Sequence, residues 1–155
     1  MQTVKAGLAA EIPEDWVWKE SLTLLEGGGK ANVIFSTEPL DPSIDLEHYV
    51  SVQGELLERE FDGYRQMTLE PMRMMGGREG RLRRFVWHPP EGVEVTQIQL
   101  YSVEGSRGYT ATATTPTSSF EELEPVLVDI LQRLAIGGAP GVAAAAQAVP
   151  PGHLA

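Results

Sequence analysis

Three histidines, His48, His88 and His153, are the side chains best suited by type to bind a metal or to transfer a proton. They fall in a predicted helix, at a strand end and in the C-terminal segment. None has another His, Asp or Glu at metal-ligand spacing in a repeated pattern. Cysteine is absent, which excludes disulfides, thiolate metal sites, cysteine nucleophiles and a lipidated cysteine. The sequence therefore predicts no metal site and no cofactor.

The remaining sequence motifs do not predict an enzyme. Gly27-Gly28-Gly29-Lys30 superficially suggests a phosphate-binding loop, but Ala31 follows the lysine where the Walker pattern needs Ser or Thr. The run is better interpreted as a hairpin turn. No Gly-x-Ser-x-Gly elbow and no Ser-x-x-Lys motif is present. We therefore predict a protein with no catalytic residues.

Five of the twelve basic residues gather in one stretch, at Arg73, Arg78, Arg81, Arg83 and Arg84. They could form an anion-binding or nucleic-acid-binding patch, or belong to a hairpin whose arginines pair with carboxylates. The net charge of −10 favours the second interpretation, because nucleic acids and anionic membranes repel an acidic chain. We expect no nucleic-acid partner. Four methionines (Met67, Met72, Met74 and Met75) could form an adaptable apolar surface, but core filling is the commoner role.

The 155 residues divide into a domain over 1–136 and a tail over 137–155. The tail has no Lys, Arg, Asp or Glu, and 14 of its 19 residues are Ala, Gly or Pro, so we expect it to be flexible. No apolar run approaches the roughly 20 residues that span a bilayer, so we expect no direct membrane insertion. Residues 1–8 do not resemble a signal peptide, so a cytoplasmic location is expected.

Within the domain, hydrophobic periodicity predicts strands over 16–25 and 31–37 joined by a hairpin, followed by a helix from an Asp45 N-cap to Gly63. Gly54 inside this helix suggests close packing against a sheet. Four strands over 64–74, 81–88, 93–103 and 107–114 form an antiparallel meander. A second helix over 119–134 begins with a predicted capping box, Ser118 or Ser119 with Glu121. The fold class is α+β, with one curved antiparallel sheet of about six strands and helices packed on it.

The last two strands carry polar side chains, but neither face of the strand over 93–103 is simply polar, because Thr96 and Ser102 lie on the face opposite to Gln97 and Gln99. Gln97, Gln99 and Tyr101 alternate with apolar residues, and Thr110, Thr112 and Thr114 alternate with Tyr109, Ala111 and Ala113. Either a ligand lies on this sheet, or both helices cover it completely.

Several segments resemble the DcrB-like family, which belongs to the PsbP-like α/β/α sandwiches. The resemblance covers about residues 2–136. It is carried by Ile12-Pro13-Glu14-Asp15-Trp16, Phe35-Ser36-Thr37-Glu38-Pro39-Leu40, Gln53, Gln97-Ile98-Gln99-Leu100-Tyr101, the strand over 109–115 and the helix from Phe120. The chain is most similar to the Eag chaperones of type VI secretion, because it lacks the signals of the lipoprotein branch. The Arg-rich hairpin and the tail depart from the family pattern.

The resemblance implies a cytoplasmic, commonly dimeric and non-enzymatic chaperone or adaptor. Its partner would be a secreted effector with N-terminal apolar helices, held on a concave sheet whose polar side chains mimic helix–helix contacts in a membrane. The residues implied to bind this partner are Leu22, Leu24, Ile34, Ser36, Gln53, Gln97 and Gln99. The alternative is a PsbP-like module that binds a small ligand or a protein and has no connection with secretion.

Overall fold

The computed structural model describes residues 10–136. The predicted tail over 137–155 lies outside the described residues. In chain order the elements are β1 (Glu20–Leu25), β2 (Asn32–Pro39), α1 (Leu46–Glu60), β3 (Arg65–Arg73), β4 (Glu79–Trp87), β5 (Val95–Glu104), β6 (Arg107–Pro116), a 3-10 turn (Thr117–Ser119) and α2 (Phe120–Gln132). The predicted α+β class is confirmed.

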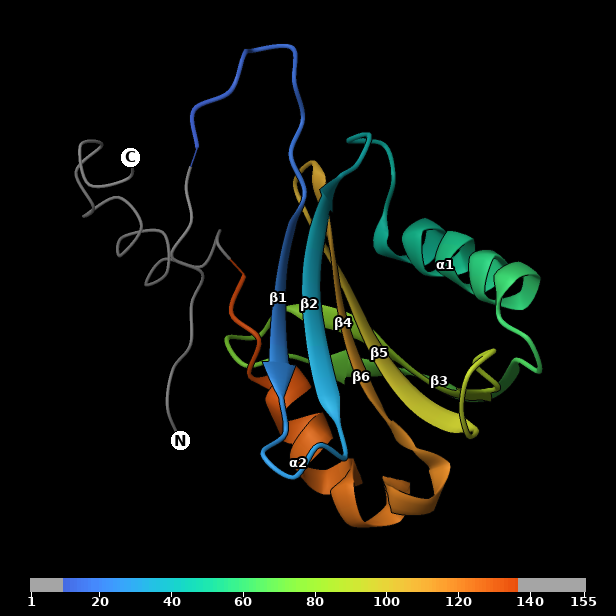
Figure 1. The fold of residues 1–155 in the computed structure, drawn as a ribbon. Helices are drawn as coiled ribbons and strands as arrows, with labels where there is room; N and C mark the ends of the chain where they lie inside the picture. Colours follow the sequence, from blue (N-terminus) through green and yellow to red (C-terminus); the bar gives the residue numbers. More distant parts are fainter. Residues whose placement is uncertain (1–9, 137–155) are drawn as a thin grey trace.

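The six strands form one antiparallel sheet in the order β1-β2-β6-β5-β4-β3 (Figure 1). The predicted meander of β3 to β6 and the predicted β1–β2 hairpin are both confirmed. The hairpin closes through the bond from the Glu26 amide to the Ala31 carbonyl, 3.0 Å. Gly29 in this turn has a φ of 76°, a conformation that favours glycine.

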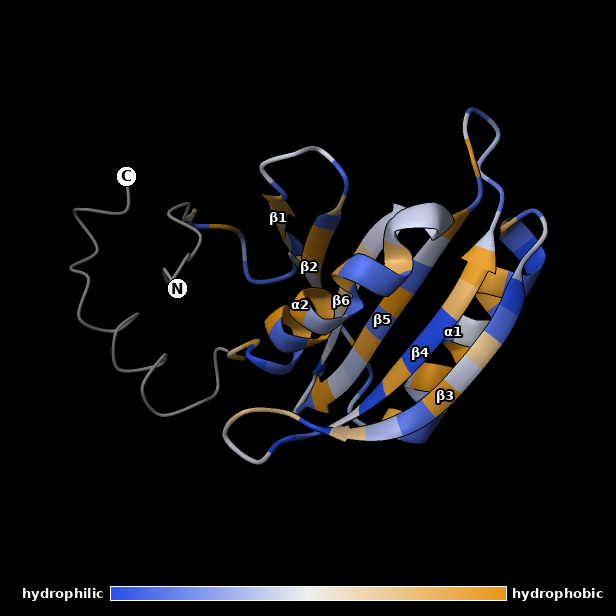
Figure 2. Ribbon diagram, turned by 90° about the horizontal axis from the view of Figure 1, so that it is seen from below, coloured by the Kyte–Doolittle hydropathy of each residue, from blue (hydrophilic) through white to orange (hydrophobic). Residues whose placement is uncertain are grey.

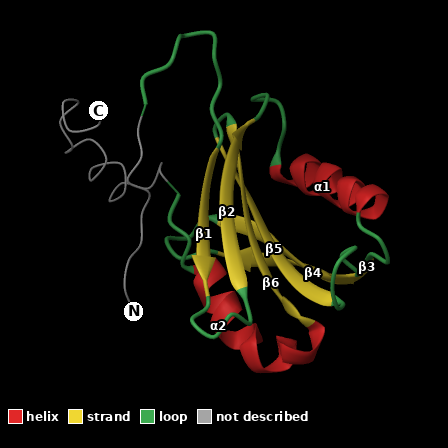
Figure 3. Ribbon diagram, in the orientation of Figure 1, coloured by secondary structure: helices red, strands yellow, loops and turns green. Residues whose placement is uncertain are grey.

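The helices pack on opposite faces of the sheet (Figure 3). Leu127 and Leu131 of α2 belong to the main core with Leu100 of β5, whereas Tyr49 of α1 packs with Tyr101. Successive residues of a strand point to opposite faces, so Leu100 and Tyr101 mark the two sides. Figure 2 shows the resulting alternation of apolar and polar residues along β5.

The first helix begins as predicted. The Asp45 side chain accepts a hydrogen bond from the His48 amide at 2.8 Å, so it is the N-cap of α1. Gly63, beyond the end of the helix, has a φ of 69°.

Two local predictions are wrong. Ser119 makes no side-chain cap, because the preceding 3-10 turn leaves it with φ −104° and ψ −2°, away from the extended conformation of a capping residue. β1 begins at Glu20 and not at Trp16. The Trp18 carbonyl accepts from Arg107 Nη2 at 2.9 Å, and the Arg107 guanidinium lies 3.6 Å from the centre of the Trp18 ring, so a side chain holds this segment.

Candidate partner-binding surfaces

A row of amides and hydroxyls crosses the sheet on the α1 side. In the β5–β6 register, Gln97 lies opposite Thr114 and Gln99 lies opposite Thr112. Gln97 Nε2 donates to Thr114 Oγ1 at 2.7 Å, and Gln99 Nε2 donates to Thr112 Oγ1 at 3.2 Å. These side chains are half-buried and bonded to one another, so the cost of removing them from water is already partly offset.

Two further donors complete this row, one from β4 and one from β5 itself. Trp87 Nε1 of β4 donates to Gln97 Oε1 at 3.0 Å, and the Tyr101 hydroxyl donates to Gln99 Oε1. Burial raises the pKa of Tyr101 above its ordinary value, opposed by the positive charge of Arg83, so this hydroxyl stays protonated at neutral pH.

Arg83 of β4 lies directly opposite Gln99 in the β4–β5 register and is only 3% exposed. It bonds no carboxylate among the described residues. Nη1 donates to the Tyr101 hydroxyl at 2.7 Å, Nη2 to the Val50 carbonyl at 3.1 Å and Nε to Gln66 Oε1 at 3.2 Å. A buried guanidinium held by neutral acceptors depends on all of those bonds, because each unmet donor carries a large desolvation cost.

Gly54 of α1 makes room for this guanidinium. A Cβ at Gly54 would lie 2.7 Å from Arg83 Nη2. The prediction that Gly54 marks close packing on the sheet is confirmed.

Three of the other clustered arginines form ion pairs, and the clustered methionines divide between the core and the surface. Arg78 pairs with Glu104, Arg81 with Glu47 and Glu79, and Arg84 with Glu70 and Glu124, as the hairpin interpretation predicts. Met74 is buried and Met72 packs against the core, whereas Met67 and Met75 are exposed. Sequence reasoning missed the special position of Arg83.

The seven residues predicted to bind a partner do not share one surface. Ile34 lies opposite Thr112, and Ser36 lies opposite Thr110, so both belong to the face of Gln97 and Gln99. Gln53 lies half-buried on α1, next to Gly54.

Leu22 and Leu24 are on the other face. In the hairpin register Leu22 lies opposite Phe35 and Leu24 opposite Val33, whose side chains point toward α2. The seven residues implied to bind the partner therefore lie on two surfaces and not on one.

The α1-side face is only partly covered. Tyr49 of α1 packs over Tyr101 of β5, and within residues 10–136 no helix lies over this face of β1 and β2 (Figure 1). Here Ile34 is 39% exposed. We call this region, formed by Ile34, Ser36, Gln97, Gln99, Thr112 and Thr114, the open face.

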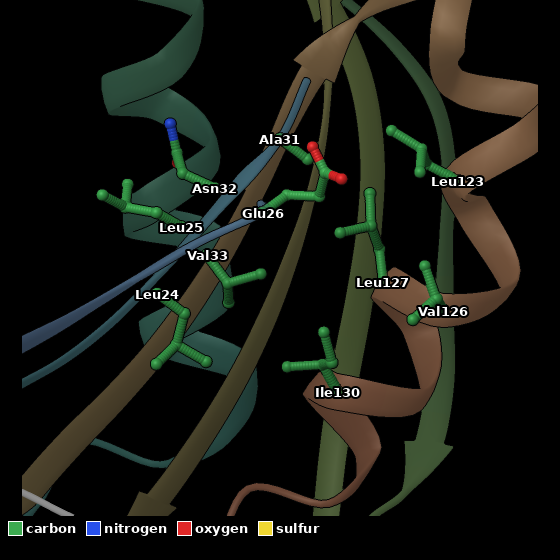
Figure 4. A pocket seen from close by; sticks show the side chains of 10 residues that line it. All are labelled: Leu24, Leu25, Glu26, Ala31, Asn32, Val33, Leu123, Val126, Leu127 and Ile130. Atoms are coloured by element: carbon green, nitrogen blue, oxygen red, sulfur yellow. The ribbon is translucent and has the colours of Figure 1, made fainter. Parts of the chain in front are cut away.

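A small apolar pocket lies on the opposite side, between the β1–β2 hairpin and α2 (Figure 4). Its volume is about 120 Å³. Its apolar lining comes from both elements and consists of Leu24, Leu25, Ala31, Val33, Leu123, Val126, Leu127 and Ile130. No sequence pattern predicted this pocket, although α2 supplies half of its eight apolar lining residues.

Within residues 10–136, no group of three or more His, Asp or Glu side chains is arranged to hold a metal ion. Neither α1 nor α2, the two α-helices of the described part, has the length and apolar character needed to cross a bilayer.

No family model matches the chain, and no curated protein matches it. Among solved structures, it is similar to PA94 from Pseudomonas aeruginosa, described as a protein of unknown function and a candidate regulator. The TM-score is 0.67 at 21% identity, over 82% of this chain and 90% of that chain. CalU16 from Micromonospora echinospora matches with a TM-score of 0.34 at 14% identity, over 75% and 78% of the two chains, and supports no argument. The likeness to PA94 shows the fold alone.

Proposed function

We propose that this protein is a non-enzymatic chaperone or adaptor that shields apolar, transmembrane-type helices of a secreted effector. It would be a DcrB-like protein with a PsbP-like sandwich, similar to the Eag chaperones, and would act in the cytoplasm as a dimer. The observation that carries the proposal is the open face, where exposed Ile34 lies beside hydroxyls and amides that are already bonded to one another.

This combination suits an apolar helix. Removing apolar area from water is favourable by about 25 cal/mol per Å², and this gain opposes the entropy cost of association. Half-buried Thr and Gln side chains provide hydrogen bonds for Ser, Thr or backbone groups of the helix, as polar side chains do between helices in a membrane. Since Gln97 and Gln99 are held by neighbours, little side-chain entropy is lost on binding.

The apolar pocket favours a second candidate function, a module that binds a small ligand. A volume of about 120 Å³ accommodates only a few carbon atoms, and its lining is almost entirely aliphatic. Such a ligand would be a short alkyl chain or the end of a larger apolar molecule.

The two candidates are separated by binding assays with a synthetic Leu/Ala helix of about 20 residues, with lysines at both ends. Ile34→Glu puts a charge into the open face and should weaken binding about tenfold or more. Val52→Glu on α1 is the matched control, because Val52 is also 39% exposed. Val126→Glu changes the pocket instead.

Loss of binding in Ile34→Glu, with Val52→Glu and Val126→Glu unchanged, supports the chaperone. Loss in Val126→Glu alone would place binding at the pocket and contradict the assignment to the open face. In cells, the tagged chain should copurify with a protein that has an N-terminal apolar helix, and deletion of that helix should abolish copurification.

A further inference from the structure

The hydrogen bonds that lead from Arg83 through Tyr101 and Gln99 to Thr112 all donate in the same direction. A guanidinium can only donate, so the Tyr101 hydroxyl, which accepts from Arg83 Nη1 at 2.7 Å, must donate its own proton onward. Its acceptor is Gln99 Oε1. The amide of Gln99 is thereby oriented with Oε1 toward Tyr101 and Nε2 toward Thr112.

The second amide obeys the same rule independently. An indole nitrogen only donates, so Trp87 Nε1 fixes Oε1 of Gln97 on its own side and leaves Nε2 for Thr114. Gln97 Oε1 therefore accepts from Trp87 of β4 and Gln99 Oε1 accepts from Tyr101 of β5, and both NH₂ groups donate to threonines of β6.

The consequence appears at Thr112. Its Oγ1 accepts from Gln99, which leaves its hydroxyl proton free to donate. This hydroxyl donates no bond within residues 10–136. Its neighbour on β2 is Ile34, whose side chain has no polar atom. Thr114 likewise donates no bond among the described residues, but its neighbour on β2 is Asn32, whose buried and unbonded Oδ1 is an acceptor.

We propose that Arg83 is a positioning residue that, through Tyr101 and Gln99, makes Thr112 a hydrogen-bond donor toward the bound partner. This inference rests on the proposed function, and it specifies the chemistry of the partner. The bound helix should present an acceptor, such as a Ser or Thr oxygen or a backbone carbonyl exposed beside a small residue, opposite Thr112 and next to an apolar contact with Ile34.

The test uses the full chain and two Leu/Ala helices of about 20 residues that differ at one central position. One has O-methylserine, whose ether oxygen only accepts, and the other has norvaline, which has the same shape and no polar atom. The wild type should bind the ether peptide about fivefold more tightly, the effect of one net hydrogen bond. Without a donor, the ether is only an added desolvation cost, and norvaline should bind more tightly.

Tyr101→Phe keeps the ring and breaks the connection between Arg83 and Gln99, so the amide can turn and the ether preference should fall to about one. Thr112→Val should abolish the preference as well. Arg84→Met is the matched control, because Arg84 is the next residue of β4, faces α2 and should leave the preference unchanged. An equal preference in wild type and Tyr101→Phe would overturn the inference.

A second measurement remains informative if neither peptide binds, which would contradict the proposed function itself. In spectra of chain labelled with ¹⁵N-glutamine, Tyr101→Phe should change the side-chain amide signals and proton exchange of Gln99. Those of Gln97, which Trp87 orients, should stay as in the wild type. Arg83→Met should affect the same residue, provided that the variant folds. Unchanged Gln99 signals in Tyr101→Phe would overturn the inference without reference to any partner.

Discussion

Gly54→Ala is expected to destabilise the protein, although the same change usually stabilises a helix. In an ordinary helix interior, alanine is favoured over glycine by about 1 kcal/mol. Here the new Cβ would lie 2.7 Å from Nη2 and 3.3 Å from Cζ of Arg83, closer than atoms pack. The guanidinium is the end of a flexible side chain, but it is 3% exposed and bonded at all three nitrogens.

The size of the effect follows from the bond that must give way. Displacing Nη2 breaks its 3.1 Å bond to the Val50 carbonyl, and a hydrogen bond from a charged group contributes about 1.5–3 kcal/mol. Subtracting the gain in helix propensity leaves a net loss of about 1 kcal/mol in the free energy of unfolding. For a chain of this size the melting temperature should fall by about 3 °C.

Urea denaturation of four proteins measures this directly: wild type, Gly54→Ala, Arg83→Met and the double variant. Once Arg83 is replaced, the clash is absent, so Gly54→Ala should become stabilising by about 1 kcal/mol. The sign of the Gly54→Ala effect should therefore reverse between the two backgrounds. A stabilising Gly54→Ala in the wild-type background would refute the position of Arg83 beneath α1.

Two further predictions concern Tyr49. Gly108→Ala would place a Cβ 2.7 Å from Cζ of the Tyr49 ring, whose hydroxyl is bonded to Thr110, and should lower the urea midpoint by an amount equivalent to about 1–3 kcal/mol. Burial raises the pKa of Tyr49 to about 12, whereas the tyrosine of the unfolded chain ionises near 10. The free energy of unfolding should therefore not depend on Tyr49 ionisation below pH 10, and it should fall as the pH rises from 10 toward 12. Urea midpoints across that range, with Tyr49→Phe as the control, should show a steeper fall in the wild type, and equal slopes would contradict the prediction.

Period-two patterns predicted much of the architecture, because each β residue in a regular strand alternates between faces. The Gln and Thr faces of β5 and β6 were assigned correctly, since both strands are long and regular. The Asp45 cap also followed from local chemistry.

The relation between strands could not be predicted in the same way. Whether Leu24 shares a face with Ile34 depends on the register of the hairpin, and one residue of slip exchanges the faces. Similarly, five clustered arginines look alike in the sequence. Only the position of Gly54 above β4 distinguishes buried Arg83 from its ion-paired neighbours.

The most direct test of the central claim is to map where an apolar helix binds the full chain, by backbone amide hydrogen exchange with and without the Leu/Ala helix. The chaperone account predicts slower exchange and shifted signals in β2 and β6, around Ile34, Ser36 and Thr112, with α2 unchanged. Protection confined to the hairpin and α2 around Leu24 and Val126, or no change at saturating helix, would contradict it.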